Sequence, residues 1–542
     1  MGCYSDSAMT APLDPHRRQL LKAAAAGAAA AGLLGLAGCA GRGRWDSDPF
    51  SLGVASGSPF ADSVVLWTRL LPAHGGLPGG GRSPVPVRWE IAHDEGFSRI
   101  AQRGETQALP QLAHSVHVEA QGLEPDRWYF YRFHAGDATS PVGRTRTLPA
   151  PDAQPARLRV SYASCQRWEH GHYAAWRHMR EEQLDLVMFL GDYIYEYPNA
   201  TAAVRDFPTL GWVHTLEQYR ERHALHRSDP DLQAMHAQCP WLLTWDDHEV
   251  QNDYAGTTEG DRYPLNMNAS GDFAARRAAG YQAWYEHMPV RAAEFARALA
   301  QGTARPELRV HSRYRFGRLA DLLLLDSRQF RDPMVCSSRA PRPAGYGTPA
   351  DCPAWNDPRR SLLGAAQEQW LDAQLAQTAG GWTVLGQQTL FGRRDTRPGP
   401  GEQLWNDGWD GYPAARARLT GSLQRHSIRD AVLLGGDVHE NWVGHVKADY
   451  SRPDSPAIGV EFCGTSITSR SGAPEVVAAR LAENPHFVFA DGWQRGYGVA
   501  EFTPARLTTR LRVLDDARRR DAQVATLASF AVERGRARVE RA

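Results

Sequence analysis

The sequence contains almost no lysine. Lys22 and Lys447 are the only two in 542 residues, and the remaining permanent positive charge comes from arginine. Lys+Arg and Asp+Glu are equal at 61 each, so basic charge is not in excess and no nucleic-acid-binding module is expected. The planar fork of arginine suits phosphate, but a GC-rich genome is the simpler explanation of this bias.

Long apolar runs are also absent beyond the N-terminus. Arg17 and Arg18 open a twin-arginine pattern that ends at Lys22, and an apolar stretch, Ala23 to Leu36, follows it. This stretch of about 14 residues is too short to cross a ~30 Å hydrocarbon core comfortably. Residues 1–39 therefore predict an export signal read by the Tat export machinery, and a protein that is periplasmic, secreted or lipid-anchored at the cell surface.

Cysteine is scarce, at seven residues. Cys39 follows Leu-Ala-Gly, which resembles a bacterial lipoprotein cleavage box, so Cys39 is either a lipid anchor or an accidental cysteine of an ordinary signal peptide. Cys336 and Cys352 flank a loop rich in proline, glycine and arginine and are the best disulfide candidates. An odd number remains after the leader, and we assign Cys165 to chemistry.

Residues 50–148 predict a small β-sandwich domain. Short β-branched or aromatic runs alternate there with Gly, Pro and Asp clusters, and we see no group of titratable residues. Leu123 to Tyr129 resembles the corner of fibronectin III and Ig-like domains, in which a tyrosine closes a turn onto the backbone. The expected strands are Val64 to Thr68, Val85 to Ile91, Ser115 to Val118 and Trp128 to Phe133.

Residues 157–515 predict a layered α/β catalytic domain. Continuous apolar runs, typical of strands covered on both faces, end abruptly in Gly, Cys, Asp or His. Open α/β sheets bind ligands at these carboxyl ends. Residues 516–542 are expected to be a charged tail that could be helical. Further expected elements are helices within Tyr173 to Glu182 and Thr215 to Ala237, and a late strand, Arg506 to Val513.

Metal-ligating residue types gather at these strand ends. Each alone has an ordinary explanation: a lone cysteine is more often a small buried hydrophobe, and an aspartate after glycine is more often a helix cap. Their occurrence in order, each after an apolar run, predicts a dinuclear metal site. The candidate ligands are Cys165, Asp192, Tyr195, Asp246, Asp247, Asn252, Asp437 and His439.

The ligand types favour two different metals. Phenolate and thiolate together suit trivalent iron, because anionic ligands offset its charge, whereas carboxylates and an amide suit Ca²⁺, Mg²⁺ or Mn²⁺. Paired Cys/His spacings are absent, which argues against a zinc finger.

The motifs resemble the PhoD-type alkaline phosphatases, within the metallophosphoesterase class that includes purple acid phosphatases. The resemblance implies a layered α+β metallophosphoesterase sandwich behind the small β-sandwich, and one Fe³⁺ beside Ca²⁺. The motifs span most of residues 50–515. They are Ser164-Cys165-Gln166, Gly191-Asp192-Tyr193-Ile194-Tyr195-Glu196, Trp245-Asp246-Asp247-His248-Glu249 through Asn252-Asp253-Tyr254, Gly386-Gln387-Gln388, Trp409-Asp410-Gly411-Tyr412 and Gly435-Gly436-Asp437-Val438-His439.

The resemblance also implies roles. Asp192 corresponds to a carboxylate that bridges the two metals and Tyr195 to an iron-bound phenolate, while Asp437 falls on the second metal and His439 on iron. Cys165 stands where most relatives of the wider class have aspartate. The Asn-His pair of that class falls on Asp247-His248, and which of Asp246, Asp247 and Asn252 bind calcium stays open.

The implied reaction uses a hydroxide or oxide that bridges the metals and attacks a phosphate monoester or diester in line. His248 would protonate the leaving alkoxide or bind phosphate, and Arg328 would either contact the phosphate as a bidentate fork or form an ordinary salt bridge.

Three functions stay open, and a monomer is expected for each. The first is an exported alkaline phosphatase that acts on phosphate mono- and diesters. The second is a phospholipase-like or teichoic-acid-type phosphodiesterase with the same site. The third is a non-enzymatic surface lipoprotein whose fibronectin-like domain binds a polymer. Residues 331–362 and Leu404 to Tyr412 could form a rim or lid over the pocket.

Overall fold

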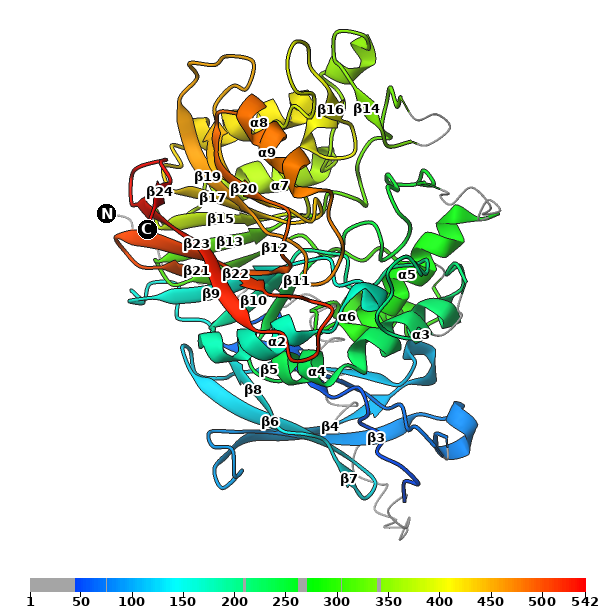
Figure 1. The fold of residues 1–542 in the computed structure, drawn as a ribbon. Coiled ribbons are helices and arrows are strands. Elements are labelled where there is room, and N and C mark those ends of the chain that lie inside the picture. The colour runs from blue at the N-terminus through cyan, green and yellow to red at the C-terminus, as the bar shows by residue number, and fades with distance from the viewer. Residues whose placement is uncertain (1–43, 75, 208–210, 262–270, 304, 339–342) are drawn as a thin grey trace, which may run out of the picture. The chain divides into compact units, whose positions relative to one another are not determined.

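The computed structural model describes residues 44–74, 76–207, 211–261, 271–303, 305–338 and 343–542 (Figure 1). These residues belong to one compact unit, Arg44–Ala542. The expected export signal and Cys39 lie outside the described residues. None of the described helices combines the length and the apolar character that a membrane crossing needs.

A ten-stranded mixed sheet carries the first strands of the expected α/β domain. Strands β9, β10 and β11 run parallel at its centre, so their carboxyl ends share one edge. In spatial order the sheet contains β24 (Glu540–Arg541), β23 (Val524–Glu533), β22 (Arg506–Leu514), β21 (Gly496–Phe502), β9 (Leu158–Ala163), β10 (Leu186–Phe189), β11 (Trp241–Leu243), β1 (Val54–Gly57), β2 (Ser63–Arg69) and β5 (Ser115–Gln121).

A seven-stranded mixed sheet carries the second half of that domain. Strands β13, β15, β17 and β19 are parallel, whereas β18 returns antiparallel beside β19. In spatial order it contains β12 (Ser312–Phe316), β13 (Ala320–Leu324), β15 (Trp382–Gly386), β17 (Ala431–Gly435), β19 (Ala457–Cys463), β18 (Asn441–Lys447) and β20 (Phe487–Asp491).

The two sheets pack face to face, and helices cover their outer faces (Figure 1). Leu186 and Met188 of β10 point into the core between the sheets, while Val187 and Phe189 point to the opposite core under the helices. The expected α/β sandwich is therefore confirmed. Its helices are α2 (Ala174–Met179), α3 (Leu216–Arg227), α4 (Pro230–His236), α5 (Phe273–His287), α6 (Ala293–Ala300), α7 (Ala365–Leu375), α8 (Pro413–Arg425) and α9 (Pro474–Glu483).

The expected helix over Thr215 to Ala237 is two helices. Thr215 caps α3 in a capping box, and Asp229 caps α4, whose first residue is Pro230. Proline fits the first turn of a helix but not its interior, so the chain restarts there.

The N-terminal segment adds a smaller sheet, which faces β2 and β5 across its own apolar core. The four expected strands are present as β2, β3, β5 and β6, and the Tyr129 hydroxyl accepts the backbone N–H of Glu124 at 2.9 Å, as the expected tyrosine corner requires. Strand β1 pairs with β11, so one N-terminal sheet continues into the ten-stranded sheet. The smaller sheet contains β4 (Ile100–Ala108), β3 (Val85–Ala92), β6 (Trp128–Ala135), β7 (Ala138–Thr139) and β8 (Gly143–Arg146).

The C-terminal segment is not helical. Its strand β23 pairs along the whole of β22, which would otherwise be an open edge. Ala528, Phe530 and Val532 alternate into the core between the sheets, a period-two pattern that the charged residues of 516–542 obscured.

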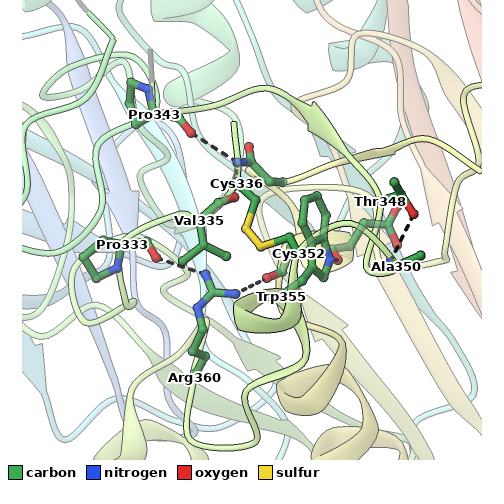
Figure 2. The surroundings of a disulfide bond; sticks show 12 residues. Pro333, Val335, Cys336, Pro343, Thr348, Ala350, Cys352, Trp355 and Arg360 are labelled. Atoms are coloured by element: carbon green, nitrogen blue, oxygen red, sulfur yellow. Dashed lines mark hydrogen bonds between the residues drawn. A yellow bond between two sulfur atoms is a disulfide. The ribbon is translucent and has the colours of Figure 1, made fainter. Parts of the chain in front are cut away.

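The expected disulfide between Cys336 and Cys352 is present, and Trp355 lies beside it (Figure 2). It ties together the segment that carries β14 (Tyr346–Gly347), which pairs with β16 (Leu404–Trp405). Both segments expected at the pocket rim are therefore joined through one two-stranded ribbon. The other described cysteines, Cys165, Cys239 and Cys463, are buried and free.

Candidate metal centre

The candidate ligands come from turns that follow the central parallel strands. Cys165 follows β9, Asp192 follows β10 and Asp437 follows β17, so both sheets contribute at the same edge. All three residues have a positive φ, near 60°, as does His439. This left-handed backbone is unfavourable for side chains with a Cβ, and strain of this kind is concentrated at functional sites.

Cys165, Asp192 and His439 form a first cluster, in which one donor atom from each lies within 4.8 Å of the others. The Tyr195 hydroxyl donates to Oδ2 of Asp192 at 3.0 Å and lies 3.3 Å from Nε2 of His439. The four side chains that the sequence assigned to iron are therefore brought together around one point.

Asp192, Asp247 and His248 form a second cluster of the same tightness. Asp192 belongs to both clusters, as a bridging carboxylate must. Oδ1 of Asp192, Oδ2 of Asp246 and Oδ1 of Asp247 are buried without a hydrogen-bond partner among the described atoms. Buried carboxylate oxygens are costly without a partner, so the orphaned oxygens of Asp192 and Asp247, which both line a cavity, fit cation ligands.

The two histidines are oriented through their Nδ1 atoms. Nδ1 of His439 faces the Arg470 carbonyl at 2.8 Å, and Nδ1 of His248 faces Oε2 of Glu196 at 2.7 Å. Burial alone would lower the pKa of His248, but the charges of Glu196 and Asp247 more than offset it and the pKa is raised. Such outer partners fix the ring and leave Nε2 for the site.

Tyr195 sits in a polar setting of its own. The Ser469 hydroxyl donates to its oxygen at 2.6 Å, and the Arg167 guanidinium lies 3.8 Å above its ring. Burial, and then the charge of Asp192, raise the pKa of the phenol well above its usual range, and the same two causes raise the pKa of the Cys165 thiol. Both groups therefore hold their protons until a cation displaces them.

The clusters open into a cavity of about 490 Å³ whose wall is strongly acidic. Burial and mutual repulsion raise the pKa of Asp192 and of Asp253, and the pKa of Asp437 is raised to about 6, with burial as the largest cause. A phosphate anion would be repelled here unless cations were bound. The lining residues are Asp192, Tyr197, Asp247, His248, Asn252, Asp253, Asp261, Trp405, Asp407, Asp437 and His439.

Arg328 is buried and fully engaged. Its Nη1 and Nη2 donate to the two oxygens of Asp407 at 2.8 and 2.9 Å, and its Nε donates to Asp246. Nη2 also lies 3.7 Å from Oδ2 of Asp247. These contacts are the ordinary ion pairs that the sequence left as one alternative, and contact with substrate phosphate would require Arg328 to leave Asp407.

Glu249 holds the ligand turns together. It accepts the backbone N–H groups of Asp192, Tyr193 and Asp246, at 3.2, 2.6 and 2.9 Å. A Cβ at Gly191, where φ is +112°, would collide with Asp246, so only glycine allows the two ligand turns to approach.

The two remaining predicted ligands, Asn252 and Asp246, differ in their position relative to the cavity. Asn252 lines the cavity, whereas Asp246 lies behind it against Arg328. Sequence reasoning missed Asp407 and Glu196. Glu196 directly follows Tyr195 in a recognised motif, and Asp407 lies in the aromatic, Gly-rich loop expected at the rim, so the sequence pattern could have indicated both residues. Asp261 also lines the cavity, but no motif in the sequence indicates it.

The geometry agrees with comparisons to known proteins. A family model described as PhoD-like phosphatase matches residues 160–511, and another, described as PhoD-like phosphatase, N-terminal domain, matches residues 37–149. The chain belongs to the PhoD-like phosphatase family. It is therefore a hydrolase of phosphoric esters, and the family is metal-dependent, in keeping with the two clusters.

Two relatives cover nearly all of the chain. Alkaline phosphatase D of Bacillus subtilis (strain 168) is 43% identical over 500 residues, which cover 90% of this chain and 82% of that protein. A solved structure described as "Structure of PhoD" superposes with a TM-score of 0.84 at 41% identity and covers 92% of this chain and 93% of that one. A Tat signal model matches residues 14–33, which shows that this phosphatase is exported.

Replacement of Asp192 tests the shared carboxylate. We expect Asp192→Asn to lose both metals on elemental analysis and to lower kcat at least ~100-fold, because loss of a residue that only orients a metal ligand already costs about 10–100-fold. Asp521→Asn, at an exposed ion pair with Arg519, is the matched control. A folded Asp192→Asn protein that retains both metals would contradict the bridging role.

Proposed function

We propose that this exported enzyme hydrolyses phosphate mono- and diesters at a site that holds Fe³⁺ beside Ca²⁺. The observation that carries the proposal is that Asp192 is shared by two clusters of different chemistry. The first adds a thiol, a phenol and an imidazole, whereas the second adds a carboxylate and an imidazole but no sulfur or phenol donor. The bound cations would supply Lewis-acid polarisation of the phosphoryl group and a nucleophilic oxygen at neutral pH.

The first cluster fits trivalent iron. Cys165, Asp192 and Tyr195 together supply three anionic donors once the thiol and phenol are deprotonated, and His439 supplies a neutral one. Three negative charges balance Fe³⁺, and the thiolate is a soft sulfur donor that calcium, which takes oxygen ligands, does not prefer.

The second cluster fits calcium. Asp247 and the amide of Asn252 face the cavity, and Asp253 and Asp407 add further carboxylates to its wall. Calcium takes six to eight oxygen ligands in flexible geometry, and the orphaned Oδ1 of Asp247 is one such donor. We assign Asp247 and Asn252 to calcium and leave Asp246 as a residue that Arg328 holds in place.

The chain itself contributes a proton donor and a rigid frame. His248 lines the cavity and its Nδ1 is held by Glu196, so its ring is positioned to donate a proton to the departing alkoxide. Its ring lies 4.2 Å from that of Tyr195, beside the first cluster.

We also propose that Cys39 carries a lipid that anchors the exported enzyme at the cell surface.

Hydrolysis assays test the substrate class. Enzyme purified after native export should hydrolyse one monoester, 4-nitrophenyl phosphate, and one diester, bis(4-nitrophenyl) phosphate, at alkaline pH. A calcium chelator should remove most of both activities, and added Ca²⁺ should restore them, because the acidic wall repels phosphate without the cation. Activity on the diester alone would favour the specialised phosphodiesterase instead.

Visible absorption tests the iron assignment. Phenolate bound to Fe³⁺ gives a charge-transfer band, so the purified enzyme should be coloured and Tyr195→Phe should lose the band. Tyr197→Phe is the matched control, because its ring also lies under Arg167, at 4.5 Å, whereas the contacts of a phenol hydroxyl with Asp192 and His439 are those of Tyr195. A colourless, iron-free and fully active enzyme would overturn the assignment.

Replacement of His248 tests the proton donor. We expect His248→Asn to lower kcat about 10²–10⁴-fold for an alkyl phosphate, whose leaving group needs a proton. The loss should be much smaller for 4-nitrophenyl phosphate, which leaves without protonation. Unchanged metal content is the control, since His248 is itself a member of the second cluster. Equal losses on both substrates, or loss of a metal, would contradict this role.

A further inference from the structure

A second cavity, also of about 490 Å³, lies at the far end of the seven-stranded sheet. Strand β18 begins two residues after His439 and ends at Lys447, which lines this cavity. At ~3.3 Å per residue the strand spans roughly 20 Å, so the cavity is separate from the metal centre. Its wall comes from the end of β18, the following loop, the segment after α9 and the loop before β24.

The wall of this cavity is basic. It contains the permanent cations Arg393, Lys447, Arg452 and Arg538, against one lining carboxylate, Glu483. Glu483 already accepts the backbone N–H of Gly399 at 2.9 Å. The excess of positive charge is the reverse of the acidic wall at the metal centre.

Lys447 is the cation best placed to receive a ligand. Its Nζ contacts the Pro453 carbonyl at 3.4 Å and forms no ion pair among the described residues. Arg452 pairs with Asp454 at 3.3 Å and Arg538 with Glu540 at 3.8 Å, but these arginines are exposed and such surface pairs contribute little. Arg393 is held by Glu402.

Aromatic and apolar groups form the rest of the wall. The rings of Tyr450 and His486 lie 5.2 Å apart, and Pro453 and Pro485 flank them. The Tyr450 hydroxyl is buried and bonds to no side chain, although the main chain of Lys447 lies beside it. Burial lowers the pKa of His486 to about 4, so its ring is a neutral surface. An anion that also carries an organic part suits this lining better than a bare inorganic ion.

We propose that this cavity binds an organic phosphate ester without hydrolysing it. The phosphate group meets Lys447 and Arg538, and the carbon portion packs on Tyr450 and His486. No metal-ligand cluster of the described residues includes a wall residue of this cavity, so the ligand leaves unchanged. This binding does not depend on the proposed metals.

The scarcity of lysine gives a direct test. In the exported enzyme without its leader Lys447 is the one lysine, so reductive alkylation there can be read by peptide mass spectrometry. We expect 4-formylbenzenesulfonate, an anionic aldehyde, to label Lys447 at least tenfold faster than neutral 4-formylbenzamide. Phenylphosphonate, which carries a non-hydrolysable P–C bond, should protect Lys447. Equal labelling by both aldehydes, or no protection, would overturn the proposal.

Matched variants separate a built site from general surface charge. Arg452→Gln and Arg538→Gln should weaken protection by phenylphosphonate severalfold while leaving hydrolysis of 4-nitrophenyl phosphate unchanged. Arg99→Gln is the control, since Arg99 is as exposed as Arg452, at 66% against 67%, and also pairs with a nearby aspartate. Equal loss of protection in Arg99→Gln would refute a specific cavity.

The phosphate ester could be free in solution or part of a lipid headgroup. Protection of Lys447 by glycerol phosphate, measured with the metals chelated to prevent hydrolysis, would identify a soluble ligand. Protection by phosphatidylglycerol vesicles at the same phosphate concentration, and not by glycerol phosphate, would identify the headgroup. If neither protects, the proposal fails.

Discussion

The burial of many aspartate carboxylates at one sheet edge constrains everything else in this enzyme. Two unit charges 4 Å apart interact by about 4 kcal/mol at an effective dielectric of 20, so a group of buried carboxylates destabilises the fold unless cations or protons offset it. Burial and the neighbouring carboxylates also raise the pKa values of Asp192, Asp253 and Asp437, because both disfavour the charged form. Cations bound at this edge would therefore stabilise the fold as well as serve the reaction.

The frame opposes this repulsion with local geometry. Cys165, Asp192 and Asp437 have a left-handed backbone conformation, which turns the backbone sharply after each strand. These turns direct the candidate ligands toward one point. Glu249 ties two of these turns through backbone N–H groups. Parallel strands supply the convergence, because their carboxyl ends lie at one edge whatever the distance between them along the chain.

The sequence predicted the catalytic sandwich, four of the N-terminal strands, the disulfide and the convergence of the candidate ligands at one sheet edge, because each has a local signature. Apolar runs marked the strands, and a Cys, Asp or His after each run marked the edge. Strand β23 was missed because its charged face hid the alternation of Ala528, Phe530 and Val532. Asp261 was missed because its place in the cavity depends on how a loop folds back, as its backbone N–H donates to the Asn252 carbonyl. Arg328 was flagged, but pattern alone could not choose between phosphate and Asp407 as its partner.

The position of Arg328 decides how phosphate is received at the metal centre. An arginine fork can bind two carboxylate oxygens at once, which a lysine cannot, and this fork is occupied by Asp407 while Nε holds Asp246. No lysine or arginine lines that cavity among the described residues, so a phosphate ester can enter only where cations have replaced side-chain charge. The basic cavity at the end of β18 can attract phosphate without a bound metal, since its wall has four side-chain cations and one carboxylate. The seven-stranded sheet thus contributes residues to two sites that suit phosphate, of which only the one with metal-binding side chains could also supply the nucleophile.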